Sequence, residues 1–149
     1  MISFADIEAA RERIKDQVYL SPFAYSETIS RMTGSRVFFK LENLQMTGSF
    51  KERGALNRLL TLTSDEAQRG VIAASAGNHG MAVAFHTQRL GIAAAIVMPL
   101  QAPLIKVSSV RRYGAQALLY GDDYAAAFQE AQRISDERAL TFIHAFNHP

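Results

Sequence analysis

The sequence lacks cysteine, so disulfide bonds and thiolate chemistry are excluded from its 149 residues. It also lacks a strong net charge, because 16 basic and 14 acidic side chains leave a formal charge of only +2. The basic residues are scattered along the chain, which argues against nucleic-acid binding. The most apolar segment, residues 92–100, is too short to cross a bilayer.

The N-terminus shows neither the basic region nor the apolar run of a signal peptide. Together with the missing cysteines, this favours a protein of the reducing cytoplasm with no nucleic-acid or membrane partner. The composition is that of an ordinary globular protein, with 48% hydrophobic and 20% charged residues. Its length is sufficient for one domain with a substantial core.

Short apolar segments alternate with helical patterns from Gly70 onward, and this alternation predicts the fold. The expected strands are residues 71–74, 93–98, 116–120 and 141–145. The expected helices are 78–90, 104–113 and a long one that is capped by Asp122 or Asp123 and ends near Arg138. The strands are apolar throughout, as in sheets covered on both faces, and helical crossovers make neighbouring strands parallel. We therefore expect an α/β fold, an open parallel sheet of about four strands flanked by helices in a three-layer sandwich.

The N-terminal third of the chain has a different pattern. Apolar side chains at helical spacing predict a helix over residues 4–16, with Ser3 able to cap it. A second, short helix is expected over residues 26–33 and should end at Gly34. Residues 36–41 are rich in β-formers and predict a strand.

The stretch that follows this strand, residues 45–55, places a lysine in an unusual position. Gly48 allows a tight turn, and Ser49 and Glu52 have the spacing of a capping box, which predicts a helix over residues 49–62. Lys51 then lies in the first turn, where the positive end of the helix dipole disfavours the ammonium and lowers its pKa. Such a lysine is a nucleophile that can form a Schiff base with an aldehyde cofactor. The alternative is an ordinary solvated lysine.

A second motif, Ser75-Ala76-Gly77-Asn78-His79-Gly80, follows the first apolar strand and opens the next helix. Free backbone N–H groups at such a helix start can bind an anion, for example a carboxylate. The alternative is a helix cap and a tight turn without a ligand. The loop has the spacing of neither a dinucleotide fingerprint nor a P-loop. His79 is a further candidate for a general base, His86 should lie partly buried or at the surface, and no residue set has the spacing of metal ligands.

Together, the two motifs resemble the threonine/serine dehydratase family of fold-type II pyridoxal-phosphate enzymes. Ser49-Phe50-Lys51-Glu52-Arg53-Gly54-Ala55 matches that family's signature Ser-Phe-Lys-x-Arg-Gly-Ala. Residues 75–80 match its asparagine loop, and the segments Glu42-Asn43-Leu44-Gln45 and Thr47-Gly48 also fit. The resemblance covers nearly the whole chain.

The resemblance implies a role for each motif residue. Lys51 would hold pyridoxal 5'-phosphate covalently and later remove the α-proton of the substrate. Phe50 would lie beside the cofactor, and Asn78 would hydrogen-bond its ring hydroxyl. The substrate carboxylate would be held by the loop residues Ser75, Ala76, Gly77, Asn78 and His79. The implied reaction is β-elimination, which converts threonine or serine to a 2-oxo acid and ammonia.

Position 76 favours elimination over racemisation, because related serine racemases tend to carry a hydroxyl in this loop and Ala76 cannot transfer a proton. Two alternatives remain: a serine racemase-like activity, and a non-catalytic α/β module that binds an anion or nucleotide or serves in assembly.

The resemblance also predicts the domain organisation. Residues 1–48 should pack with a larger cofactor domain that is absent from this chain, and residues 49–149 should form the small α/β domain. The strand over residues 36–41 would then lack a partner. The family's phosphate-binding glycine loop would lie beyond residue 149, so we expect an inactive N-terminal fragment of such an enzyme. Apolar surface left uncovered predicts self-association.

Overall fold

A four-stranded parallel sheet lies at the centre of the computed structural model, which describes residues 2–146. The strand order is β5-β4-β3-β6, and each neighbouring pair is parallel. The strands are β3 Val71–Ala74, β4 Ala94–Met98, β5 Gln116–Leu119 and β6 Thr141–Phe142. The predicted sheet is therefore confirmed, although β6 is shorter than expected.

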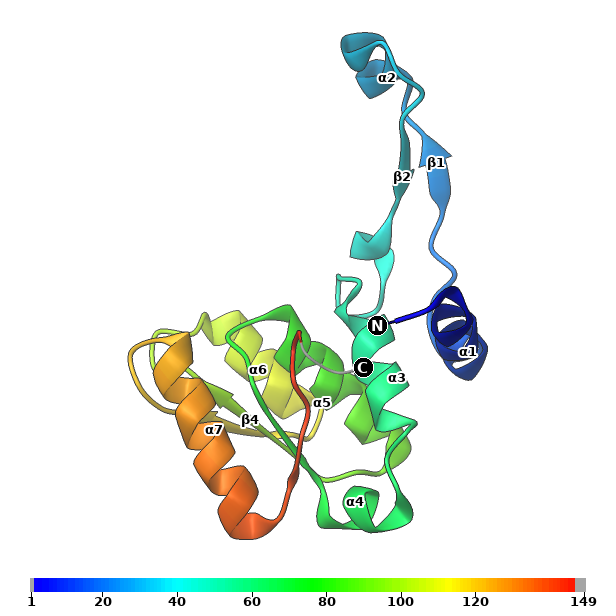
Figure 1. Ribbon diagram of the computed structural model, residues 1–149. Coiled ribbons are helices and arrows are strands. Elements are labelled where there is room, and N and C mark those ends of the chain that lie inside the picture. The colour runs from blue at the N-terminus through cyan, green and yellow to red at the C-terminus, as the bar shows by residue number, and fades with distance from the viewer. Residues whose placement is uncertain (1, 147–149) are drawn as a thin grey trace.

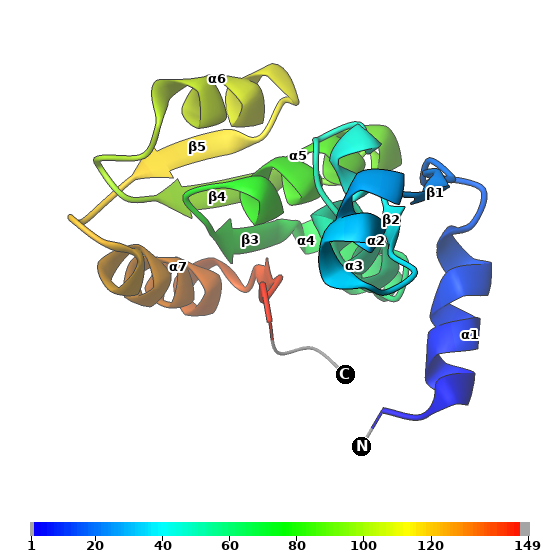
Figure 2. The ribbon, with the colours of Figure 1, turned by 90° about the horizontal axis from the view of Figure 1, so that it is seen from above.

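Helices cover both faces of this sheet (Figure 2). Alternate residues of β3 point to opposite faces, so Val71 belongs to one buried cluster and Ile72 to the other. The first cluster includes side chains of α5 and α6, and the second includes side chains of α7. These helices are α5 Asn78–Leu90, α6 Leu104–Arg112 and α7 Tyr124–Arg138, the last capped by Asp123 as predicted. The three-layer sandwich is confirmed.

Two helices extend the face that carries α5. Helix α3 packs on α5, and α4 leads from α3 into the sheet. Their bounds are α3 Lys51–Leu59 and α4 Ser64–Arg69. Helix α4 is too short to show periodicity and was not predicted, but a capping box of Thr63 and Glu66 marks its start. Helix α1, Phe4–Ile14, lies beside α3 and has the predicted cap at Ser3 (Figure 1).

An arm projects from the sandwich between α1 and α3 (Figure 1). It contains β1 Phe23–Tyr25, α2 Glu27–Thr33, β2 Phe38–Lys40 and the 3-10 helix η1 Glu42–Leu44. Strand β2 pairs with β1 in antiparallel fashion, which corrects the expectation that residues 36–41 lack a partner. Strand β1 is only three residues long and directly follows Pro22, so it gives little sequence signal. All residues of this two-stranded ribbon are exposed.

The helices of the described residues are all too short or too polar to cross a membrane.

Candidate functional site

The loop before α3 differs from the predicted capping box. The Ser49 hydroxyl accepts from the amide of Lys51 at 3.3 Å, and not from that of Glu52. The Glu52 carboxylate instead accepts from the backbone N–H of Thr47, one residue before the turn at Gly48, where φ is +75°. Helix α3 consequently begins at Lys51 and not at Ser49. Lys51 still lies in the first helical turn, as predicted.

A charged network anchors this loop to the arm. The guanidinium of Arg53 donates two hydrogen bonds to Glu42, from Nε at 2.7 Å and Nη2 at 2.8 Å. These bonds lower the pKa of Glu42 to about 2. The Gln45 amide donates to the carbonyl of Tyr19 at 2.8 Å, and its oxygen accepts from the amide of the same residue. The Glu42–Gln45 segment of the motif thus fixes the chain that leads to the lysine.

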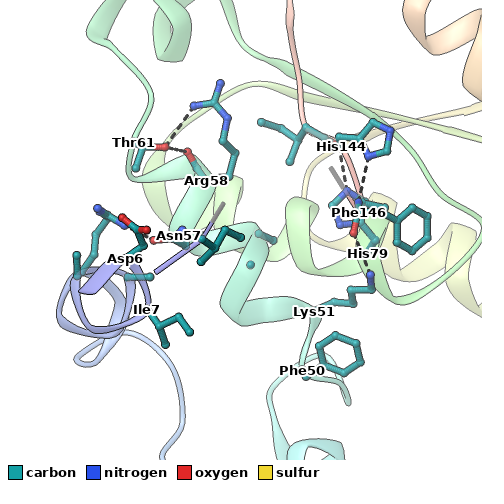
Figure 3. Close-up of a pocket in the computed structure, with 18 residues that line it drawn as sticks. Asp6, Ile7, Phe50, Lys51, Asn57, Arg58, Thr61, His79, His144 and Phe146 are labelled. Atoms are coloured by element: carbon teal, nitrogen blue, oxygen red, sulfur yellow. Dashed lines mark hydrogen bonds between the residues drawn. The ribbon is translucent and has the colours of Figure 1, made fainter. Parts of the chain in front are cut away.

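The amine of Lys51 lies between two aromatic rings (Figure 3). Nζ donates to the carbonyl oxygen of Ala145 at 3.0 Å, and it is 4.5 Å from the ring centroid of Phe146 and 5.4 Å from that of Phe50. Among the described residues, no carboxylate forms an ion pair with it. The half-buried amine is therefore held by weak partners that a ligand can displace.

The asparagine loop lies at the carboxyl end of β3, where parallel sheets bind ligands. Gly77 is the N-cap of α5 and provides no side-chain cap, so the positive end of the helix remains available to an anion. The amide of Gly77 donates to the Ser75 hydroxyl at 3.1 Å. A Cβ at Gly80 would lie 2.8 Å from Cγ2 of Ile96, so only glycine permits this close approach of α5 to β4.

A lysine that the sequence did not indicate contacts this loop. Nζ of Lys106, in the first turn of α6, donates to Oδ1 of Asn78 at 2.9 Å. An ammonium group can only donate, so it fixes the amide oxygen and leaves Nδ2 of Asn78 as a donor. Its place in the chain could have indicated this contact, because α6 follows β4 and the carboxyl ends of adjacent parallel strands share one edge of the sheet.

The side chain of His79 turns inward. It is 7% exposed, and its Nε2 lies 3.0 Å from the carbonyl oxygen of Ile143. The imidazole thereby joins α5 to the segment that follows β6. His86, expected to be partly buried or at the surface, is fully buried.

The two motifs meet at a cavity of about 270 Å³. The predicted site residues that line it are Phe50, Lys51, Ser75, Ala76, Asn78 and His79, whereas Gly77 does not. Unpredicted lining comes from Ala74, Tyr124, Ala145 and Phe146, and burial raises the pKa of the Tyr124 hydroxyl. A larger cavity of about 940 Å³, drawn in Figure 3, adjoins it between α1 and α3 and shares Lys51. The described residues contain no group of three or more side chains that could hold a metal ion.

Comparison with known proteins gives consistent matches. Residues 14–149 match the family described as pyridoxal-phosphate dependent enzyme. L-threonine ammonia-lyase of Thermotoga maritima is 46% identical over 149 residues, which are 100% of this chain and 37% of that protein.

Solved structures share the fold. Serine racemase from Dictyostelium discoideum superposes with a TM-score of 0.90 at 31% identity, covering 99% of this chain and 48% of that one. The processed form of threonine deaminase isoform 2 from Solanum lycopersicum gives a TM-score of 0.88 at 35% identity, with 99% and 45% covered. The chain spans less than half the length of each of these proteins.

Proposed function

The chain belongs to the family of pyridoxal-phosphate dependent enzymes, and from this premise we propose that Lys51 carries the cofactor of a threonine or serine ammonia-lyase. The observation that carries the proposal is the convergence of two motifs on one cavity. Lys51 and Asn78, the first residue of α5, both line that cavity, although residues 56–74 separate the two motifs. The threonine ammonia-lyase relative supports this choice of reaction.

The residues around the cavity fit the cofactor. Lys51 supplies a primary amine without a carboxylate partner among the described residues, and Asn78 supplies an amide donor for the ring oxygen. When bound, pyridoxal phosphate supplies an aldehyde that condenses with amines and a ring that stabilises negative charge on the substrate. Phe50 and Phe146 flank the amine, and their rings provide apolar surface for that ring.

The protein's own groups then have distinct tasks. The Ser75 hydroxyl, the backbone amides that open α5 and the dipole of that helix would hold the substrate carboxylate. This would place the α-carbon near Nζ of Lys51, which takes up the α-proton when it is free of the cofactor. Racemisation would also need a proton donor at position 76, on the other face of the substrate. The methyl group of Ala76 cannot act as one. Loss of the β-hydroxyl is therefore favoured over return of a proton to the other face.

The reaction is tested by measuring 2-oxo acid and D-serine from one incubation with pyridoxal phosphate and L-serine, and 2-oxo acid from a parallel incubation with L-threonine. We expect release of 2-oxo acid with little D-serine from an enzyme that contains this chain, and neither product from residues 1–149 alone. Ala76→Ser should raise the ratio of racemisation to elimination about tenfold or more, because a positioned acid or base contributes roughly 10²–10⁴-fold. The wild type differs from this variant by one hydroxyl and is the matched control. Wild-type protein that racemises serine faster than it releases 2-oxo acid would contradict the proposal.

Lys106 should strengthen cofactor binding by orienting Asn78. Lys106→Met should weaken the affinity for pyridoxal phosphate about five- to tenfold, the effect of one lost hydrogen bond. Lys106→Arg, which keeps a donor, should retain most of the affinity. Absorbance titration measures both variants. In an Asn78→Ala background, Lys106→Met should have no further effect; an undiminished effect there would show that Lys106 contacts the ligand directly.

We also propose that the arm, within residues 1–48, packs on a further domain of such an enzyme. Both of its strands are exposed on both faces, so the ribbon has no core of its own. Phe23 stacks on Phe38 with ring centroids 5.3 Å apart, and both rings remain accessible. Uncovered apolar surface of this kind also supports self-association.

A further inference from the structure

The residue that follows Lys51 carries a buried carboxylate, and this carboxylate faces a buried imidazole. Glu52 follows Lys51 in the first turn of α3, and His86 lies on the neighbouring helix α5. Each side chain is 1% exposed, and Oε2 of Glu52 lies 3.8 Å from Nε2 of His86. Within residues 2–146, neither this oxygen nor either ring nitrogen has a hydrogen-bond partner. Buried polar groups without partners are costly, so their position calls for an explanation.

The other oxygen of the same carboxylate holds the lysine loop. Oε1 of Glu52 accepts from the backbone N–H of Thr47, just before the turn at Gly48. One side chain therefore holds the loop and also approaches α5. Because α5 begins with Asn78, a bond between His86 and Glu52 would join the two halves of the candidate site.

The protonation state of His86 suits such a contact. Burial, assisted by the charge of Arg89, lowers the pKa of His86 to about 4, so the ring is neutral near neutral pH and keeps one N–H. With its hydrogen on Nε2, the ring donates toward Oε2 of Glu52. The distance of 3.8 Å exceeds a direct hydrogen bond, and a side-chain shift of about 1 Å closes it.

Apolar side chains of the two helices are also buried together. Ala55 and Leu59 of α3 belong to the same buried cluster as Met81 and Ala82 of α5. Apolar packing is non-directional and tolerates small displacements of one helix along another. A buried polar pair, by contrast, favours one register.

We propose that His86 is a positioning residue that orients the Glu52 carboxylate and, through it, fixes the Thr47–Phe50 loop and Lys51 relative to the start of α5. The consequence for the chemistry rests on the proposed function. The consequence for the loop does not, because it concerns the backbone of the protein without a ligand.

Hydrogen exchange at the Thr47 amide tests the positioning role in the absence of cofactor. His86→Leu should accelerate exchange at this amide about tenfold, the effect of losing roughly 1.4 kcal/mol of local protection. His86→Gln keeps a donor near the position of Nε2 and should stay within about twofold of the wild type. The amide of Ser75, bonded to the carbonyl of Val97 at 3.0 Å, is the internal reference and should not change.

Two results would overturn the proposal. In one, Thr47 exchanges at the wild-type rate in His86→Leu. In the other, the amides of Thr47 and Ser75 accelerate equally, which would show a general loosening of the core. If His86→Leu does not fold, His86→Met provides the same comparison, because it also removes the ring N–H and keeps an apolar side chain. Exchange at Thr47 should then rise about tenfold and exchange at Ser75 should not.

A second experiment measures the rate at which pyridoxal phosphate becomes covalently attached to Lys51 in the presence of borohydride. This rate should fall about tenfold in His86→Leu and remain near the wild-type value in His86→Gln. If the wild-type protein gives no adduct, the proposed function fails, while the Thr47 exchange rates still decide the positioning role. If the adduct forms and Thr47 does not respond to His86→Leu, the positioning role fails and the proposed function stands.

Discussion

Lys51→Ala should abolish covalent attachment of pyridoxal phosphate to the protein. The chain has four lysines, and the structure separates Lys51 from the others. Lys15 forms an exposed ion pair with Glu12, and Lys40 donates to a backbone carbonyl within the arm. Lys106 is engaged by Asn78. Only Lys51, among the four, lines the cavity that the asparagine loop shares.

The measurement is an absorbance spectrum followed by borohydride reduction and peptide mapping. A bound cofactor on lysine absorbs at roughly 410–420 nm, so this band should be present in the wild type and absent from Lys51→Ala. The control variants Lys15→Ala and Lys40→Ala should keep both the band and the modified peptide. A band that survives in Lys51→Ala would remove this lysine from its proposed role. Without any band in the wild type or in a longer chain that adds the further domain, the non-catalytic anion-binding alternative would be favoured.

Lowering the pH from 7 to 5 should reduce the free energy of unfolding by about 2 kcal/mol through His86 alone. Burial lowers the pKa of this side chain from 6.5 to about 4 in the folded protein. Above pH 6.5, His86 is neutral in both states and adds no pH dependence. As the pH falls below 6.5, His86 becomes protonated in the unfolded chain, whereas in the folded protein it stays neutral until about pH 4. Stability is therefore lost over this window and levels off below it.

The pH range from 5 to 7 isolates this effect from the carboxylates. The pKa of Glu42 is lowered to about 2 by its hydrogen bonds from Arg53, so its contribution is lost only as the pH falls below 4.5. Urea unfolding at several pH values gives the slope of the unfolding free energy against pH. His86→Leu should lose most of it, whereas Thr87→Val, a change at the adjacent buried position, should keep it. An equal slope in wild type and His86→Leu would contradict the assignment.

The sandwich was predictable because its strands and helices have clear local signals. Uniformly apolar segments separated by helical patterns allow few arrangements other than a parallel sheet. The pairing of β1 with β2 was not predictable, because β1 is a three-residue strand whose side chains are not buried. The capping box failed for a tertiary reason. The Glu52 carboxylate is drawn into the interface with α5 and reaches Thr47 in place of the Ser49 amide.

The candidate site, too, was predictable only where the sequence carries a local signal. Local chemistry and motif spacing indicated Lys51 and the asparagine loop, and the fold brings them to one cavity. Lys106 and Tyr124 carry no motif and enter the site only because their helices begin at the same edge of the sheet. The pairing of Glu52 with His86 depends on how α3 crosses α5, which no local pattern specifies.

The sheet order has a consequence for how such a site can diversify. Each strand ends at the same rim and sends a different side chain there: Asn78 after β3, Lys106 after β4, Tyr124 after β5 and Phe146 after β6. These contributions come from separate connections, so a mutation in one connection leaves the strands beneath the others in place. Natural or laboratory evolution can therefore alter one contact of the rim at a time while the sandwich stays intact.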